Sequence, residues 1–180
     1  MAHNIILTGM PGAGKSTVGV ILAKNLGMDF VDLDILISKR QKCTLQNIID
    51  ARGLGEFLKI EELEATELEA ENTVIATGGS VVLSEAAMGH LLKMGINIYL
   101  DVPTRELARR LSNIKTRGIA AHPGERIEDI YKARLPLYKK YADITLNCSD
   151  KTTEDIVEEV SRPSYLRSVL KMKGMALNEI

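Results

Sequence analysis

The sequence has little of what several classes of protein need. It has no tryptophan, 4% aromatic residues and a net charge of -1, so it offers neither a stacking platform nor a basic surface for nucleic acid. Its two cysteines, Cys43 and Cys148, form no C-x-x-C pair, which is typical of reduced thiols. No apolar run approaches the roughly 20 residues that span a bilayer. We therefore expect a cytoplasmic protein without a nucleic-acid or membrane partner.

Short apolar runs alternate with longer segments that have the period of a helix. The runs cover residues 5–7, 30–32, 73–77, 96–100 and 144–147, and each is as short as a strand buried on both faces of a parallel sheet. The predicted N-caps are Thr44, Ser84 and Thr152, the last with Asp155 in a capping box. The alternation predicts an α/β fold with a doubly wound parallel sheet, in one domain over residues 1–162.

Three segments depart from this alternation. Residues 34–72 are largely helical, so we expect them to form an insertion between the second and third strands. The acidic part of this insertion, which continues to residue 70, is expected to be an amphipathic helix whose acidic face is solvated. Residues 113–125 contain glycine and proline and are expected to form a mobile loop. For the weakly amphipathic tail, 163–180, packing on the domain, fraying and contact with a partner all stay open.

Residues 9–16, G-M-P-G-A-G-K-S, match the pattern G-x-x-x-x-G-K-[ST] between a predicted strand and a predicted helix. In such a loop the backbone N–H groups and the helix N-terminus hold phosphates, the lysine reaches the β- and γ-phosphates, and the hydroxyl ligates Mg²⁺. The alternative is a glycine-rich turn with no ligand. The motif in this context predicts a nucleoside triphosphate site whose residues are Gly9, Pro11, Gly12, Ala13, Gly14, Lys15, Ser16 and Thr17.

Two aspartates, Asp32 and Asp34, stand at the end of the second predicted strand in the motif F-V-D-L-D. The period of a strand would point both to the same side, at the sheet edge where ligands gather. Asp32 is the candidate for the metal, through water, and Asp34 is the candidate general base for a substrate hydroxyl. The alternative is that they cap a helix, because D-x-D-I-L-I-S-K is also typical of a helix start.

Basic residues outnumber acidic ones between residues 105 and 134. An arginine such as Arg117, on a loop that closes over the site, stabilises charge on a transferring phosphoryl group. The alternative is a solvated helix pair with partial ion pairing, which is favoured for Arg105 and Lys132. With Lys15 and Asp34, Arg117 completes the predicted catalytic set.

Motifs in order over about residues 3–160 resemble those of the shikimate kinase family of small P-loop kinases. They are G-M-P-G-A-G-K-S-T, F-V-D-L-D, I-A-T-G-G, R-R-L-S-N-I-K-T-R and R-L-P-L-Y-K-K-Y-A-D. The resemblance implies transfer of the γ-phosphate of ATP to a hydroxyl of shikimate, a small-molecule acceptor, with Mg²⁺ as cofactor. It also implies the P-loop NTPase three-layer sandwich, with a five-stranded parallel sheet, a substrate-binding insertion and a lid. We expect a monomer, although the sequence alone does not reveal the oligomeric state.

The resemblance assigns roles to residues one by one. It places Lys15 and Ser16 at the phosphates and Mg²⁺, Asp32 at the metal through water, and Asp34 at the substrate hydroxyls. The other implied contacts are those of Gly78 and Gly79 with the substrate, Arg134 with its carboxylate, Arg110 with adenine and Arg117 with the phosphates.

Departures from the family pattern fall in the substrate-binding and lid motifs. Leu58 stands where family members carry an arginine that pairs with the shikimate carboxylate, Ser80 replaces the third glycine of T-G-G-G, and Gly118 replaces the lid proline. Loss of a charge-assisted contact of about 1.5–3 kcal/mol corresponds to roughly a ten- to hundredfold loss of affinity. Lys59 is adjacent to Leu58 but is expected to face another direction, about 100° round the helix; Arg52 is another possible substitute. The alternatives are therefore a paralogous kinase with another acceptor and a nucleotide-binding regulatory protein without transfer activity.

Overall fold

The computed structural model describes residues 4–111, 119–121, 124–162 and 164. The strands make one parallel sheet in the order β2-β3-β1-β4-β5. Their bounds are β1 (Asn4–Thr8), β2 (Asp29–Asp32), β3 (Thr73–Ala76), β4 (Gly95–Asp101) and β5 (Ile144–Asn147). The sheet confirms the predicted strands and their parallel arrangement. Because β1 lies between β3 and β4, the chain changes direction across the sheet beside β1, which places a ligand crevice beyond its carboxyl end.

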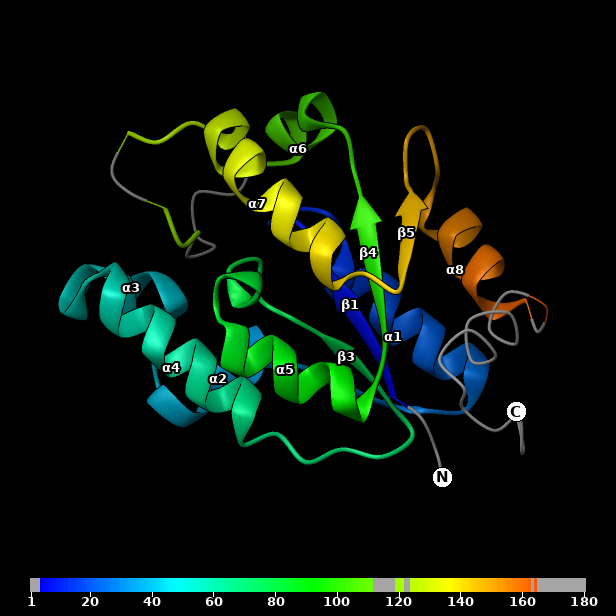
Figure 1. Ribbon diagram of the computed structural model, residues 1–180, viewed down its shortest axis with the longest axis horizontal. Coiled ribbons are helices and arrows are strands. Elements are labelled where there is room, and N and C mark those ends of the chain that lie inside the picture. Colours follow the sequence, from blue (N-terminus) through cyan, green and yellow to red (C-terminus); the bar gives the residue numbers. More distant parts are fainter. Residues whose placement is uncertain (1–3, 112–118, 122–123, 163, 165–180) are drawn as a thin grey trace.

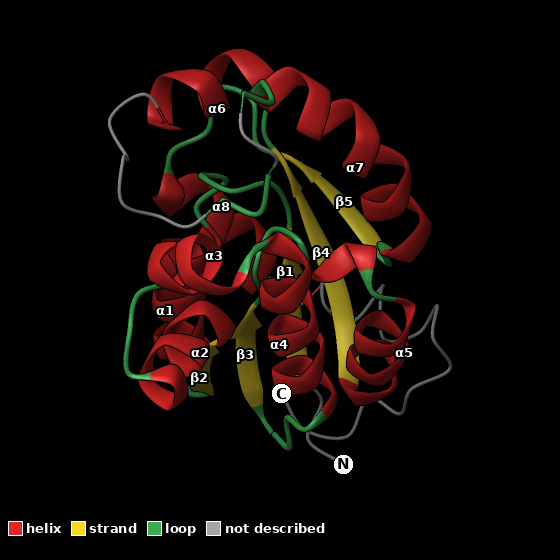
Figure 2. Cartoon of the chain, turned by 90° about the vertical axis from the view of Figure 1, so that its left-hand side faces the viewer, coloured by secondary structure: helices red, strands yellow, loops and turns green. Residues whose placement is uncertain are grey.

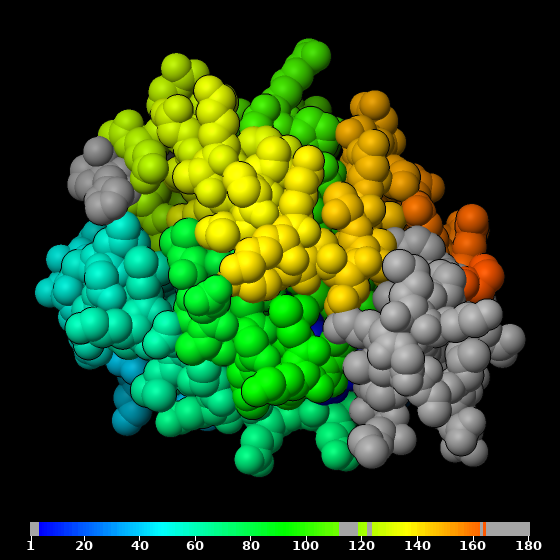
Figure 3. Space-filling model, in the orientation of Figure 1, coloured from blue at the N-terminus to red at the C-terminus, as the bar shows by residue number. Residues whose placement is uncertain are grey.

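Helices cover both faces of the sheet and make the predicted three layers. On one face α1 (Lys15–Leu26) packs against α8 (Thr153–Ser161), while α5 (Glu85–Met94) and α7 (Ile127–Tyr141) lie on the other (Figure 1). Figure 3 shows α5 and α7 as a nearly continuous green and yellow surface that leaves only traces of blue visible. Every residue of β1 is buried, as the unbroken apolar run predicts for a central strand.

The remaining helices lie near the carboxyl ends of the strands or beside the sheet. α6 (Thr104–Leu111) follows β4, and a 3₁₀ turn, η1 (Val81–Leu83), leads from β3 to α5. The predicted insertion consists of α2 (Leu33–Gln41), α3 (Leu45–Arg52) and α4 (Leu54–Thr66), which pack on one another at one end of the molecule (Figure 2). Among the described residues, no helix has the length and apolar character that crossing a membrane requires.

The insertion has an apolar core of its own. We call this cluster the small core; its buried members are Ile37, Ile48, Phe57, Ile60 and Ala120. The main core contains the strands and the inner faces of α1, α5, α7 and α8. The insertion thus rests on far less buried apolar surface than the sheet does, which predicts lower local stability.

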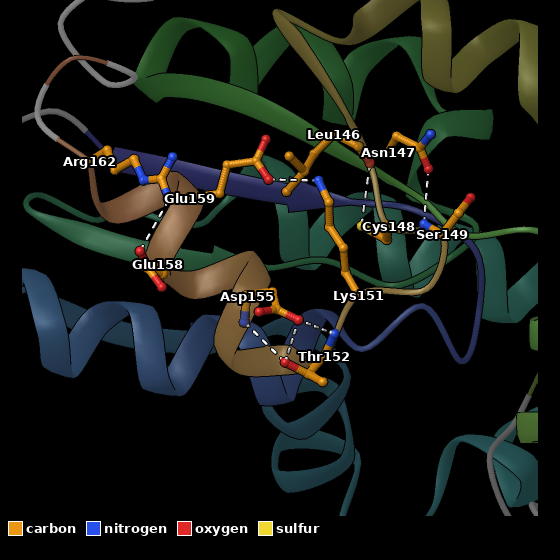
Figure 4. A network of polar contacts seen from close by, with 10 residues as sticks. All are labelled: Leu146, Asn147, Cys148, Ser149, Lys151, Thr152, Asp155, Glu158, Glu159 and Arg162. Carbon is orange, nitrogen blue, oxygen red and sulfur yellow. Dashed lines mark hydrogen bonds and ion pairs between the residues drawn. The ribbon is translucent and has the colours of Figure 1, made fainter.

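The predicted helix caps are confirmed. The Thr44 and Ser84 hydroxyls accept hydrogen bonds from backbone N–H groups of α3 and α5, at 3.2 and 3.0 Å. At the start of α8, Thr152 and Asp155 exchange the hydrogen bonds of a capping box (Figure 4). These caps occupy N–H donors that the first turn of a helix otherwise leaves without a partner.

The prediction for the acidic segment is partly wrong. The segment forms the amphipathic helix α4, but Glu61 and Glu64 are buried whereas Leu63 is 55% exposed. A buried carboxylate is unfavourable without a partner. Arg40 of α2 lies 2.9 Å from Glu64 and compensates it, and Glu61 faces the site described next.

Candidate active site

The glycine-rich loop connects β1 to α1 through left-handed backbone conformations. Gly12 has φ 80° and Gly14 has φ 97°, values that residues with a Cβ rarely adopt. At Gly9 a Cβ would lie 2.9 Å from the carbonyl oxygen of Leu100 on the neighbouring strand. The glycines of the motif are therefore required by backbone geometry, and the loop leads directly into the N-terminus of α1, as an anion-binding loop does.

Lys15 lies at this N-terminus with its ammonium turned toward the loop. Its Nζ donates hydrogen bonds to the carbonyl oxygens of Gly9 at 2.8 Å and Met10 at 3.0 Å. Burial lowers the pKa of Lys15 to about 8, although Asp34 and Asp32 act in the opposite direction. A phosphate group would oppose that decrease by placing further negative charge beside the ammonium.

A cavity of about 660 Å³ lies beyond the carboxyl ends of the strands. It brings residues of the glycine-rich loop, for which phosphate binding is predicted, together with the two aspartates and Arg134, which are far apart in the sequence. Its lining also includes Phe57 and Glu61 of α4 and Ile119 and Ala120 of the predicted lid segment. The cavity is large enough for the phosphates of a nucleotide and a small acceptor side by side.

The two aspartates line the cavity, but they do not lie on one strand as predicted. β2 ends at Asp32, so the strand period does not apply to Asp34, which lies in the first turn of α2. The helix-cap alternative is correct for Asp32, whose carboxylate accepts a hydrogen bond from the backbone N–H of Ile35 at 3.2 Å. The strand-to-helix corner nevertheless places both side chains in the lining of the cavity.

Arg134 holds the base of the cavity together. It is buried on α7 and donates from Nη1 to the carbonyl oxygen of Gly79 at 3.0 Å and from Nη2 to that of Ala120. Tyr138, one turn later, donates to the same Gly79 carbonyl at 2.6 Å. A Cβ on Gly79 would come within 2.6 Å of the Pro11 ring. The loop after β3 is therefore fixed between α7 and the phosphate loop.

Arg110 lies outside the cavity lining. Its guanidinium donates to the carbonyl oxygens of Gly12 and Ala13, at 3.3 and 3.4 Å, and pairs with Glu106 at 2.9 Å. It is thus adjacent to the phosphate loop, and its contact with adenine stays a prediction. Arg117, Gly118 and most of the predicted lid, as well as nearly all of the tail, lie outside the described residues.

Neither suggested substitute for the family arginine reaches the cavity. Lys59 pairs with Glu56 at 3.4 Å and is 78% exposed, and Arg52 donates to Gln41 on the outer side of the insertion. Three residues for which no role is predicted, Lys39, Lys42 and Glu61, also line the cavity. Only Glu61 had a signal that could have found it, because it ends the family motif G-x-x-x-F-x-x-x-E that starts at Gly53.

Comparisons with known proteins agree with this geometry. Residues 11–163 match the family model described as shikimate kinase. The chain is 38% identical to the shikimate kinase of Caldanaerobacter subterraneus subsp. tengcongensis, over 95% of this chain and 98% of that protein. It is also 38% identical to that of Haemophilus influenzae strain PittEE, over 88% and 90%.

A solved structure gives the same result at the level of the fold. The shikimate kinase from Acinetobacter baumannii, determined in complex with shikimate, superposes with a TM-score of 0.85 at 30% identity and covers 96% of both chains. The fold described above is thus shared over nearly the whole length of both chains. The chain belongs to the shikimate kinase family.

Proposed function

We propose that the chain transfers the γ-phosphate of ATP to a hydroxyl of shikimate, and that it does so as a monomer. The observation that carries the proposal is the single cavity that holds Lys15, Asp34 and Arg134. All three come from one chain, so no second subunit is needed to complete the site. The matching relatives and the structure in complex with shikimate support this acceptor.

In this mechanism the residues position the reactants and stabilise charge. Lys15 and the phosphate loop hold the β- and γ-phosphates, and Arg134 faces the carboxylate of shikimate. Asp34 accepts the proton of the attacking hydroxyl. The hydroxyl oxygen forms a bond to the γ-phosphorus as the bond to the bridging oxygen breaks, and ADP leaves. Gly78 and Gly79 keep the loop after β3 close to the acceptor, and Arg117 stabilises the transferring group.

The oxygen donors at the phosphate loop fit Mg²⁺. The described residues contain no group of three or more acidic, histidine or cysteine side chains that would form a metal cage. Mg²⁺ is usually held by one or two protein oxygens, waters and substrate phosphates. The Ser16 hydroxyl and the Asp32 carboxylate, the latter through water, are such ligands, and the cation would neutralise charge on the phosphates.

One observation favours a second acceptor. Leu58 packs on the small core and does not line the cavity, so α4 offers no guanidinium for a carboxylate. A paralogous kinase whose acceptor lacks a carboxylate is consistent with this.

A coupled ADP-release assay tests the proposal. We expect shikimate to stimulate ADP release more than matched polyols and hydroxy acids do. Asp34→Asn should lower kcat by about 10²–10⁴, the usual contribution of a general base. Asp29→Asn, an exposed aspartate at the start of β2, is the matched control and should leave kcat unchanged. A folded protein that binds ATP and phosphorylates none of these acceptors would be a regulatory protein and would refute the proposal.

A further inference from the structure

Glu61 is a buried acid that the mechanism above does not use. It is 2% exposed, and its Oε1 has no hydrogen-bond partner among the described residues. This oxygen occupies the space that a Cβ at Gly78 would need, and Oδ1 of Asp34 lies 2.9 Å from the same point. Two carboxyl groups therefore share the side of the cavity next to Gly78, where the acceptor is expected.

Glu64, one turn later on α4, has a cationic partner, which Glu61 lacks among the described residues. Arg40 lies 2.9 Å from Glu64 and supplies a counter-charge. Among the described residues no cation lies at ion-pair distance from Glu61. The position one turn before it on the same helix is Leu58, where the family pattern has arginine. An arginine there would be placed to pair with Glu61 at i, i+3.

The second departure from the family pattern meets the same carboxyl group. Ser80 is buried at the N-terminus of η1, and its hydroxyl hydrogen-bonds to Glu61. The chain thus has a neutral hydroxyl beside Glu61 in place of a guanidinium. Leu58 and Ser80 are unrelated in sequence position, yet both change the surroundings of one acid.

The charges around Glu61 favour its neutral form. Burial is the largest cause that raises its pKa, to about 7, and Asp34 adds to the increase. The Ser80 hydrogen bond, Arg134 and Lys15 act in the opposite direction. An acceptor carboxylate placed beside Arg134 would raise the pKa further, because like charges disfavour each other. When two neighbouring acids differ in this way, the neutral one donates and the ionised one accepts.

We propose that Glu61 acts as a neutral carboxylic acid that donates a hydrogen bond to the carboxylate of a small hydroxy-acid acceptor, replacing the family arginine at position 58. This inference rests on the proposed function and refines how the acceptor is recognised. Arg134 remains the cationic contact, and Asp34 remains ionised for the hydroxyl. Binding of the acceptor is then linked to retention of one proton on Glu61.

The proposal predicts a pH dependence that acts on KM. Below pH 7 the free enzyme already carries the proton on Glu61. Above it, each pH unit should raise KM for shikimate by about tenfold, because one proton must be taken up with the acceptor. The change in kcat should be smaller, since bound shikimate keeps Glu61 protonated. The methyl ester of shikimate, which has no carboxylate charge, should show no such slope.

The experiment measures KM and kcat for shikimate at saturating MgATP from about pH 6 to about pH 9, a range that spans the pKa of Glu61. Saturating nucleotide keeps Lys15 charged, so its titration does not contribute. Glu61→Gln, an isosteric amide that always donates, should remove the slope in KM. Leu58→Arg should also remove it by holding Glu61 ionised and supplying its own charge. Glu56→Gln, on the exposed side of α4, is the control and should keep the slope.

Calorimetry gives an independent readout. Shikimate binding to the MgADP complex near pH 8 should take up close to one proton in the wild-type protein and none in Glu61→Gln. A wild-type KM that does not change with pH, while shikimate is phosphorylated, would overturn this inference and leave the proposed function intact. Absence of shikimate turnover at every pH would overturn both.

Discussion

The phosphate-binding half and the acceptor-binding half of the cavity are built differently. The phosphate loop is attached to β1, a strand whose every residue is buried in the main core, and its shape depends on glycine conformations. The acceptor half depends on side chains of α2 and α4, which rest on the small core. In the proposed function the first half binds phosphate, a group common to all nucleotides, through its backbone. The second can change by substitution of single side chains, and two departures from the family pattern occur near it, Leu58 on α4 and Ser80 at the start of η1.

The largest effect should come from the phosphate half. Lys15→Met is expected to lower kcat by about 10³ or more, because a charge aimed at the transferring group is lost. The free protein should not lose stability. Burial lowers the pKa of Lys15 from 10.5 to about 8, so the folded state releases the proton first. This disadvantage is fully present below pH 8 and disappears toward pH 10.5, so any stability gained by the variant should shrink over that range.

Steady-state kinetics and thermal unfolding at several pH values check this prediction. Lys24→Met, an exposed lysine in the last turn of the same helix, is the control. A Lys15→Met variant with normal turnover would contradict the role of the phosphate loop.

The next effect should be confined to the acceptor half. Phe57 is 1% exposed in the small core and also lines the cavity. Phe57→Ala should cost about 3–5 kcal/mol of local packing. We expect KM for shikimate to rise at least about tenfold while KM for ATP changes little, since the phosphate loop rests on the main core. Hydrogen exchange should show loss of protection in α2–α4 before the sheet. Leu63→Ala, on the exposed side of α4, is the control, and equal effects on both substrates would contradict the division into halves.

A substitution that improves binding of the acceptor should also affect only the acceptor half. Leu58→Arg restores the family residue and should improve KM for shikimate by about ten- to hundredfold at high pH, where Glu61 is ionised. KM for ATP should stay the same. If phosphorylation of a carboxylate-free acceptor were lost while shikimate gained nothing, the native pocket would be specific for that other acceptor.

The smallest effect should come from the face of the sheet farthest from the acceptor. Thr152→Ala removes the capping box of α8 and should cost about 1 kcal/mol, seen as a lower Tm (Figure 4). Both KM values should remain at wild-type levels because α8 packs on α1 and contributes nothing to the cavity. Thr153→Ala, the next residue, lacks a capping role and is the control. A kinetic change in Thr152→Ala would mean that the halves communicate through α1.

The sequence predicted most of the fold because its signals are local. Apolar runs, N-caps and the glycine-rich motif each depend on a few neighbouring residues. Thr44, Ser84 and Thr152, for example, cap helices at the predicted positions. Burial of Glu61 could not be predicted this way. An acidic residue on an amphipathic helix is usually solvated, and Glu61 lines the cavity because α4 packs against α5, α3, α2 and η1 in the tertiary structure.

Arg134, a predicted substrate-binding residue, illustrates the same limit. Arg134 was found through a motif, but its hydrogen bonds to Gly79 and Ala120 join segments that only tertiary structure brings together. The role of Asp34 is tested by the Asp34→Asn variant, and the roles of Arg110 and Arg117 stay predictions.

Ala120 belongs to two structures at once. Its side chain is part of the small core with Phe57, and its carbonyl oxygen accepts a hydrogen bond from Arg134 of α7. The described part of the predicted lid at Ala120 is therefore anchored on the acceptor side of the cavity. If binding of the nucleotide or of the acceptor displaces Ala120, the affinity for the other ligand changes. Thermodynamic reciprocity then requires that each ligand alter the affinity for the other by the same factor.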